Sequence, residues 1–194
     1  MAISMKGTFI VIVRGKVKML TLERITVHNI DYAVEIQSEL FSKESARVNY
    51  EESLDRSSGY EYFLLYQNDD CVGITGIYNN LDNQDSAWLG WFGIRERYRR
   101  HHLGSEALKI FEEMAVARGY QFARLYTDAE NNDAAIAFYQ SNGYTGEPYC
   151  NTDDPACFKY KVMIFSKALK GQKMVPWNNE SIRLTEQIAK QEKG

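Results

Sequence analysis

Residues 88–120 constrain the fold of this chain more than any other segment. An apolar, aromatic-rich run over residues 88–94 predicts a buried strand, and a helical pattern of apolar residues begins at Leu103 or Gly104. The turn between them is unusually rich in basic side chains, namely Arg99, Arg100, His101 and His102. The segment therefore predicts the order strand, cationic turn, helix.

The N-terminus of such a helix attracts anions. Its first backbone N–H groups have no partner within the helix, and the aligned peptide dipoles add roughly half a positive charge there. Arginine side chains in the turn add donors suited to phosphate oxygens. We therefore expect residues 99–105 to bind a pyrophosphate group, with backbone contacts from Leu103, Gly104 and Ser105.

Length and composition indicate one globular domain. The chain has 194 residues, of which 44% are hydrophobic, and a formal net charge of −3, which favours cationic small molecules over nucleic acid as partners. Its three cysteines lack zinc-type spacing, so we predict reduced thiols, a cytoplasmic protein and no metal site. The longest apolar run near the N-terminus, residues 9–13, is too short to cross a membrane. We expect no membrane partner.

The first half of the chain alternates helical and extended patterns. Residues 1–18 remain open between an extra edge strand over residues 8–13 and a leader that precedes Met19. A strand over residues 20–25 is followed by a helix capped at Asn29 or Asp31, and a second short helix is expected over residues 45–53. The predicted extended segments are a hairpin over residues 60–66 and 71–78, which a polar loop over residues 79–85 joins to the central strand.

The second half continues the alternation. Glycines end the two predicted helices, Gly119 after the helix that follows the cationic turn and Gly143 after a helix over residues 132–142. The remaining predicted elements are strands at 121–127, 144–149 and 158–166 and a tail helix from about Asn179. The order β-α-α-β-β-β-α-β-α-β-β describes one α/β domain with a mixed sheet. We place the domain at residues 20–168, between an N-terminal extension (1–19) and a C-terminal tail (169–194).

The helix over residues 132–142 carries a second candidate constellation. At 100° per residue, Tyr139 lies within about 20° of Asn132 and Ala135 within about 60°, so one face presents an amide, a methyl group and a phenol. Ala135 would leave room for a ligand chain to which Asn132 could donate a hydrogen bond. The alternative is an amphipathic helix in which Tyr139 is a core residue with a polar tip.

These two segments together resemble a known family. The turn from Arg99 to Gly104 is similar to the R-x-x-G-x-G/A pyrophosphate loop of the GNAT superfamily of acyl-CoA-dependent N-acyltransferases. Residues 132–144 resemble that family's N-x-x-A-x-x-F-Y-x-x-x-G-F/Y helix. The resemblance covers residues 20–167 and implies a mixed, mostly antiparallel central sheet, flanked by helices and splayed at the central strand. One loop glycine of the family is His102 here, and its Cβ restricts left-handed backbone geometry, although its imidazole could contact phosphate instead.

The resemblance also implies an activity and a cofactor. A GNAT enzyme would transfer an acetyl group from acetyl-CoA to a primary amine of a small molecule or peptide by direct attack. Pantetheine would bind main-chain groups of Phe92 and Ile94 and the helix face of Asn132 and Ala135, and Tyr139 would protonate the departing thiolate. Gly90 and Gly93 fit this picture, because glycine in a strand often marks a bulge or the close approach of another chain.

The general base and the acceptor stay open. Many GNAT enzymes place a carboxylate on the central strand, but Trp88, Gly90 and Phe92 occupy the alternate positions here. Asp85, Asp128 or an ordered water are the candidates. A rival function is a non-catalytic module that binds phosphate ligands or nucleic acid through the basic stretch Arg95–Arg100, although the net charge argues against nucleic acid. A monomer and a homodimer are both compatible with the sequence.

Overall fold

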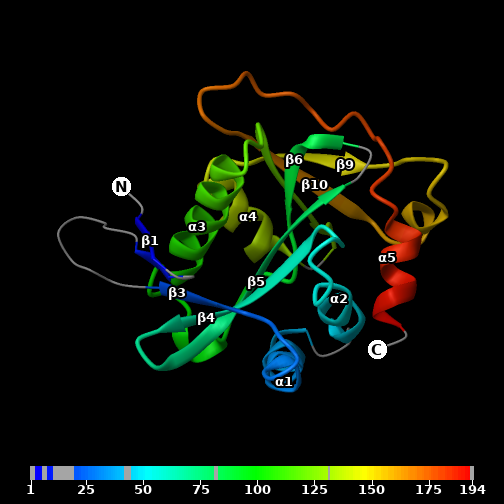
Figure 1. The fold of residues 1–194 in the computed structure, drawn as a ribbon. Helices are drawn as coiled ribbons and strands as arrows, with labels where there is room; N and C mark the ends of the chain where they lie inside the picture. Colours follow the sequence, from blue (N-terminus) through cyan, green and yellow to red (C-terminus); the bar gives the residue numbers. More distant parts are fainter. Residues whose placement is uncertain are drawn as a thin grey trace. The chain divides into compact units, whose positions relative to one another are not determined.

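The computed structural model describes residues 3–5, 8–10, 20–41, 45–80, 83–130 and 132–192, and Figure 1 shows their arrangement along the chain. The strands are β1 (Ile3–Met5), β2 (Thr8–Ile10), β3 (Leu20–Arg24), β4 (Tyr60–Gln67), β5 (Asp70–Asn80), β6 (Asn83–Leu89), β7 (Gly93–Ile94), β8 (Phe122–Asp128), β9 (Thr145–Tyr149) and β10 (Val162–Ala168). The helices are α1 (Ile30–Leu40), α2 (Arg47–Glu52), α3 (Leu103–Ala117), α4 (Asp133–Ser141) and α5 (Leu184–Gln191), with 3-10 turns η1 (Glu96–Tyr98) and η2 (Pro155–Phe158).

The strands form one mixed sheet with the order β3-β4-β5-β6-β8-β10-β9, to which β7 adds by pairing with β5. Strands β6 and β8 run parallel, and the other pairs whose register is described are antiparallel. The predicted mixed, mostly antiparallel sheet flanked by helices is confirmed. Strands β1 and β2 form a separate two-stranded sheet.

The chain groups into two compact units. The first consists of Met1–Tyr78, Leu89–Met114 and Gln191–Gly194, and the second of Asn79–Trp88 and Ala115–Lys190. Each unit therefore combines segments that are distant in sequence.

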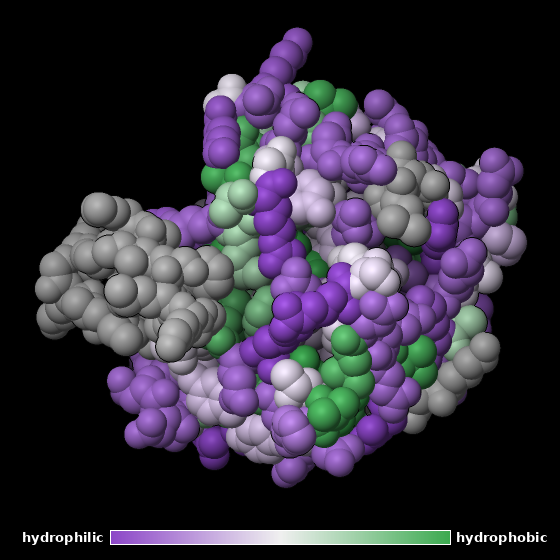
Figure 2. Space-filling view, viewed as in Figure 1, coloured by the Kyte–Doolittle hydropathy of each residue, from purple (hydrophilic) through white to green (hydrophobic). Residues whose placement is uncertain are grey.

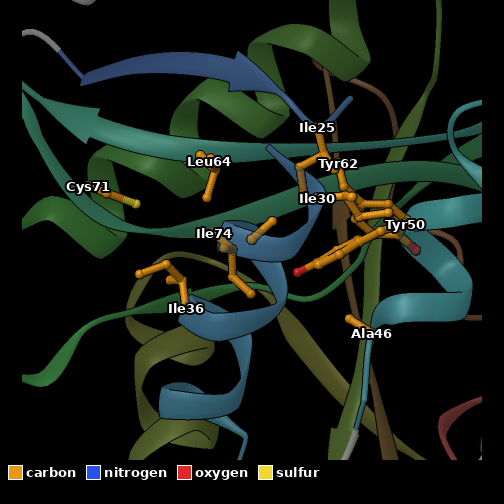
Figure 3. Close-up of a cluster of buried hydrophobic side chains, with 10 residues drawn as sticks. Ile25, Ile30, Ile36, Ala46, Tyr50, Tyr62, Leu64, Cys71 and Ile74 are labelled. Atoms are coloured by element: carbon orange, nitrogen blue, oxygen red, sulfur yellow. The ribbon is translucent and has the colours of Figure 1, made fainter. Parts of the chain in front are cut away.

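In the first unit, α1 and α2 pack against β4 and β5. Apolar residues three apart on α1, such as Ile30, Ala33 and Ile36, share one helical face, and this face is buried. Figure 3 shows the resulting cluster of buried side chains, which consists of Ile25, Ile30, Ala33, Ile36, Ala46, Tyr50, Tyr62, Leu64, Cys71 and Ile74. These two short helices are therefore held by packing rather than by intrinsic helix propensity.

A buried arginine lies in the core of the second unit. Arg124 on β8 is only 2% exposed, and its guanidinium donates to the hydroxyls of Ser86 (3.0 Å) and Ser166 (2.5 Å) and to the carbonyl of Val175 (3.0 Å). Burial lowers the pKa of Arg124, while three nearby carboxylates act in the opposite direction. The group remains charged at neutral pH because the ordinary pKa of arginine exceeds 12.

The C-terminal tail, residues 169–192, packs into the second unit over most of its length. The buried Trp177 meets the ring of Trp88 edge-on at 4.9 Å, and its backbone N–H donates to the Glu147 carboxylate at 3.0 Å. The N–H of Asn178 donates to the second oxygen of the same carboxylate. The domain boundary predicted at residue 168 stays a prediction, but the packing of Trp177 continues the core beyond it.

Asp154 attaches helix α5 to the loop between β9 and β10. Its carboxylate accepts hydrogen bonds from the backbone N–H groups of Leu184 (2.6 Å) and Thr185 (2.9 Å), and also from the hydroxyls of Thr185 and Tyr149. Burial favours a higher pKa for this carboxyl, but these hydrogen bonds outweigh it and the pKa is lowered. The Asp154 carboxylate therefore caps the first turn of α5, although Asp154 lies 30 residues before the start of this helix.

Three sequence-based boundaries are wrong. The predicted polar loop at 79–85 is largely strand, because β5 extends to Asn80 and β6 begins at Asn83. The strand predicted from Phe158 begins only at Val162, since Pro155 starts a 3-10 turn and Phe158 is 74% exposed. The tail helix begins at Leu184 rather than near Asn179.

The N-terminal segment and the surface complete the description. Of the two alternatives for this segment, the strand is present over residues 8–10 as β2, which pairs with β1 and is not part of the main sheet; residues 11–13 lie outside the described residues. Figure 2 shows apolar residues scattered among hydrophilic ones on the face that it presents. Among the described residues, no helix is long and apolar enough to cross a membrane.

Candidate functional site

The predicted site residues fall into two groups, one in each unit. The first group lies where the chain enters α3. Arg100 and His102 both have left-handed backbone conformations, with φ of +63° and +65°. When left-handed and right-handed residues alternate along a turn, the backbone N–H groups of successive residues point toward one concave surface. This geometry commonly binds anions. The predicted phosphate-binding turn therefore has the backbone shape that this function needs.

The first turn of α3 adds donors to this concave surface. The first intrahelical hydrogen bond runs from the N–H of Glu106 to the carbonyl of His102 (3.0 Å), so the N–H groups of Leu103, Gly104 and Ser105 precede it. Leu103 is buried and anchors the start of the helix. The sequence-based assignment of these three donors therefore agrees with the helix boundary.

Arg99 has a second role that the sequence did not show. Its side chain is exposed, but its Nε donates to the carbonyl of Ile94 at 2.9 Å. This bond ties the cationic turn to the end of β7. The carbonyl is one of the main-chain groups of Ile94, to which we expected pantetheine to bind. It already accepts one hydrogen bond, although a carbonyl oxygen can accept two.

His102 stands where left-handed geometry favours glycine. We expect His102→Gly to raise the free energy of unfolding by about 0.5–1 kcal/mol, because relief of Cβ strain outweighs the greater entropy of unfolded glycine. Its affinity for CoA should stay within about threefold unless the imidazole contacts phosphate. Urea denaturation and calorimetry measure the two quantities. His101→Gly is the control. Because φ of His101 is not positive, glycine relieves no strain there, and the variant should lower the free energy of unfolding. A loss of stability in His102→Gly would contradict the strain argument.

The strand predicted at residues 88–94 is interrupted by a β-bulge. The N–H of Gly90 donates to the carbonyl of Gly76 at 3.2 Å, so these two residues lie opposite each other. The next described pair is Gly93 with Ile74, which is three residues further along one strand but only two along β5. Two residues of one strand therefore lie opposite a single residue of β5. The prediction of one continuous strand is wrong here, although the glycines at positions 90 and 93 did signal an irregularity.

The two bulged residues are Trp91 and Phe92, opposite Thr75. Trp91 has φ of +44°, and a bulky residue in this region costs about 1–3 kcal/mol unless its surroundings compensate. Its indole N–H donates to Oδ1 of Asn49 at 3.0 Å, and its ring meets Phe41 edge-on at 5.4 Å. Sequence reasoning missed Asn49, since no local pattern links residues 42 positions apart.

The close approach of the strands beside the bulge requires glycine. A Cβ on Gly76 would lie 2.2 Å from a ring carbon of Tyr62 and 2.9 Å from the carbonyl oxygen of Gly90. Both distances are far below van der Waals contact, so any side chain at position 76 would displace the Tyr62 ring or the bulge. Close packing of Tyr62 and Gly76 against Gly90 therefore restricts where the start of the bulge can lie.

The second group of predicted residues lies on α4 in the second unit. Asn132 is the N-cap of this helix with φ of −127° and ψ of +31°, so it lies outside the regular helical turn. Its side-chain N–H donates to the hydroxyl of Thr127 at 2.7 Å. The predicted shared face thus holds for Ala135 and Tyr139, which are helical, but not strictly for Asn132. Ala135 is half-buried and remains compatible with contact to a ligand chain.

Tyr139 is mostly buried. It is 7% exposed, and its ring packs against Phe138 (5.3 Å), Tyr144 (6.1 Å) and Phe165 (5.5 Å). Burial raises the pKa of its phenol above the ordinary value of about 10, so the proton is retained at neutral pH. The ring therefore has the packing expected of a core residue, and it still carries a proton that could be donated.

The two carboxylate candidates for the general base differ in their surroundings. Asp85 accepts a hydrogen bond from the hydroxyl of Ser86 at 2.7 Å. Asp128, the last residue of β8, has its pKa raised first by partial burial and second by the negative charge of Glu130. A raised pKa makes a carboxylate a stronger base, so the surroundings of Asp128 are compatible with a general base.

Comparison with known proteins identifies the family. The family model described as "Acetyltransferase (GNAT) family" matches residues 28–144, which is more than half of the 194-residue chain. No curated protein matches the sequence. The chain resembles the ribosomal-protein-S18-alanine N-acetyltransferase of Escherichia coli, with 21% identity and a TM-score of 0.62 over 84% of this chain and 100% of that chain.

Two further solved structures share the fold. One is an acetyltransferase from Thermus thermophilus, with 18% identity and a TM-score of 0.62 over 77% of this chain and 97% of that one. The other is a GNAT family acetyltransferase from Elizabethkingia anophelis with acetyl-CoA bound, with 15% identity and a TM-score of 0.58 over 77% and 98% of the two chains. At these identities the likeness concerns the fold, and together with the family match it shows that the chain belongs to the acetyltransferase (GNAT) family.

Proposed function

We propose that the protein transfers an acetyl group from acetyl-CoA to a primary amine of a small molecule or peptide, by direct attack of the neutral amine on the thioester. The observation that carries this proposal is the turn that precedes α3. The left-handed backbone of Arg100 and His102 and the helix-start N–H groups of residues 103–105 support binding of an anion at the position where the family resemblance expects pyrophosphate. Arg99 and Arg100 supply positive charge.

The same proposal assigns the remaining contacts of the cofactor. The pantetheine arm would bind main-chain groups of the bulged segment at Phe92 and Ile94, as an added strand binds a sheet edge. Tyr139 would donate a hydrogen bond to the departing sulfur, and Ala135 would contact the arm. Asp85, Asp128 or an ordered water would accept the proton of the amine. A cytoplasmic location and the oligomeric state remain predictions from the sequence.

The basic stretch 95–100 gives little support to the rival function. Arg95 is not available for phosphate, because its guanidinium pairs with both carboxylate oxygens of Glu39 at 2.8 Å and donates to the carbonyl of Cys71. The guanidinium of Arg97 lies 4.9 Å from the ring of Tyr98. With Arg95 paired to Glu39, the basic stretch offers fewer cations than its sequence suggests, which suits one pyrophosphate better than an extended nucleic-acid backbone.

An acceptor screen tests the proposed activity. Acetyl-CoA is incubated with polyamines, amino acids, aminoglycosides and peptides, release of the CoA thiol is followed with a thiol-reactive dye, and the acetylated product is identified by mass spectrometry. Peptides that begin with alanine belong in the panel, because the E. coli neighbour is the ribosomal-protein-S18-alanine N-acetyltransferase. Cys150 is exposed, so a protein-only baseline is subtracted. Binding of CoA with no amine-dependent thiol release across the panel would favour the binding module.

Replacing Arg99 tests the phosphate-binding turn. We expect Arg99→Ala to weaken CoA binding about tenfold at ~10 mM salt and by less at ~1 M salt, where charges are screened within about 3 Å. Arg99→Lys should recover the salt-dependent part, because it keeps the charge. Isothermal titration calorimetry gives the affinities, and Arg56→Ala, which removes another exposed arginine, is the control. Unchanged affinity in both Arg99→Ala and Gly104→Val would exclude this turn as the phosphate site.

A further inference from the structure

Helix α2 is held firmly within the first unit. The buried Gln37 of α1 accepts a hydrogen bond from the N–H of Ala46 at 3.3 Å, immediately before α2 begins. At the other end of the helix, Arg24 of β3 donates to the carbonyl of Ser53 at 3.1 Å. Both ends of this six-residue helix are therefore tied to neighbouring elements, so its side chains have well-defined positions.

One side chain of α2 reaches the bulge. Asn49 is 8% exposed, and its Oδ1 accepts the indole N–H of Trp91 at 3.0 Å. The Trp91 ring also packs against the buried cluster of Figure 3 and meets Phe41 edge-on. Packing fixes roughly where the indole lies, but only the hydrogen bond is directional and sets the rotation of the ring.

The orientation of the Trp91 ring is coupled to the backbone conformation of the same residue. A tryptophan with φ of +44° tends to relax to an extended conformation unless its surroundings hold it. That relaxation would rotate the peptide planes on both sides of Trp91, including the one that carries the N–H of Phe92. The contact with Asn49 opposes such rotation, and it therefore controls the direction of the main-chain groups in the bulge.

We propose that Asn49 is a positioning residue for the cofactor: through Trp91 it holds the bulge in the conformation whose main-chain groups bind the pantetheine arm of CoA. The inference rests on the proposed function, since it assumes that this cofactor binds along residues 92–94. Asn49 itself need not touch the cofactor. Its role is to preorganise a binding strand, which improves affinity by removing the cost of ordering that strand on binding.

Two ligands distinguish this positioning role from a general loss of binding through poorer folding. CoA carries the pantetheine arm, whereas adenosine 3′,5′-bisphosphate represents its nucleotide end without that arm. We expect Asn49→Ala to weaken CoA binding about tenfold, the size of one hydrogen bond within a preorganised site. Binding of the bisphosphate should stay within about twofold of wild type, because the phosphate-binding turn is unchanged. Isothermal titration calorimetry on the full chain measures both.

Four further variants test whether Asn49 acts through Trp91. Trp91→Phe keeps an aromatic ring but removes the indole N–H together with part of the ring, so it should reproduce the loss in CoA affinity. The double variant with Asn49→Ala should lose no more than about twofold beyond either single one. Asn49→Asp keeps an acceptor oxygen and should bind CoA within about threefold of wild type. Ser53→Ala, which removes a buried hydrogen bond from its hydroxyl to the carbonyl of Tyr50 on the same helix, is the stability control.

The possible outcomes are distinct. If the wild-type protein does not bind CoA, the proposed function fails, whatever the variants do. If it does bind CoA, equal weakening of both ligands in Asn49→Ala, or weakening of neither, overturns the positioning role. Additive losses in the double variant would also overturn it, because they would show that Asn49 does not act through Trp91. Should Asn49→Ala not fold, Trp91→Phe alone decides by the same comparison of ligands.

Discussion

Tyr139→Phe is expected to lower kcat at least about tenfold, while the dissociation constant for acetyl-CoA changes by less than about threefold. When the amine attacks the thioester, the sulfur leaves with negative charge, and a donor placed at that atom stabilises the transition state. Such an interaction forms mainly in the transition state, so its loss appears in kcat rather than in binding of the cofactor. Steady-state kinetics with an acceptor from the screen and calorimetry give the two numbers.

The burial of Tyr139 refines the expected chemistry. Burial raises the pKa of the phenol, whereas a free thiol has a pKa of about 8.5. Complete proton transfer from this tyrosine to the leaving thiolate is therefore uphill, and stabilisation by a hydrogen bond is favoured over full protonation. Since the tyrosine keeps its proton throughout the neutral range, its contribution should not vary with pH between about 6 and 9.

Tyr144→Phe is the matched control for this experiment. Tyr144 is also buried, and its ring lies 6.1 Å from that of Tyr139, so the same atom is removed from a neighbouring ring. We expect its kcat to stay within about twofold of wild type. Both variants keep their rings and should fold. Wild-type turnover in Tyr139→Phe, with chemistry shown to be rate-limiting, would make Tyr139 a packing residue only.

Arg124→Ala is expected to lower the free energy of unfolding by about 3–5 kcal/mol. The variant leaves the hydroxyls of Ser86 and Ser166 and the carbonyl of Val175 without their buried donor, and it removes the cation above the Trp177 ring at 5.2 Å. It also opens a cavity, because the side chain is almost completely enclosed. Urea denaturation followed by circular dichroism measures the loss.

A second variant separates the charge from the volume. Arg124→Met fills much of the space and also removes the cost of keeping a charge away from water, so we expect a smaller loss of about 1–3 kcal/mol. Arg118→Ala, on the surface, should change stability by no more than about 0.5 kcal/mol. A loss below about 1 kcal/mol in Arg124→Ala would show that the three acceptors find other partners and that the arginine is not required for packing of the tail.

Features that depend on neighbouring residues were predicted well. Helix α3 begins at Leu103 as expected, and Gly119 and Gly143 have the positive φ values of +89° and +85° that end a helix. The possibility of left-handed strain at His102 was also visible, because the family pattern has glycine there. Each of these features is decided by backbone sterics or by hydrogen bonds within one helical turn. Both kinds of interaction involve residues only a few positions apart.

Features that depend on distant partners were predicted poorly. Residues 79–80 and 83–85 are polar and lack the apolar alternation of a strand, yet they belong to β5 and β6, which are neighbours in the sheet and so satisfy backbone groups through each other. Helix α5 starts at Leu184 because Asp154, 30 residues earlier, caps that turn. No local signal marks such a cap.

The sequence alone determined the order of the main elements, because periodicity, capping and backbone sterics are local properties of the chain, and its two motifs resemble the family that the comparison identifies. Only the tertiary structure decided that Arg124 is buried with its charge, that Tyr139 belongs to the core, and that Asn49 holds Trp91 in a strained bulge. Burial and strain depend on which segments pack together, and contacts between residues about 40 positions apart, such as Arg124 with Ser86 or Asn49 with Trp91, form only when the chain has folded.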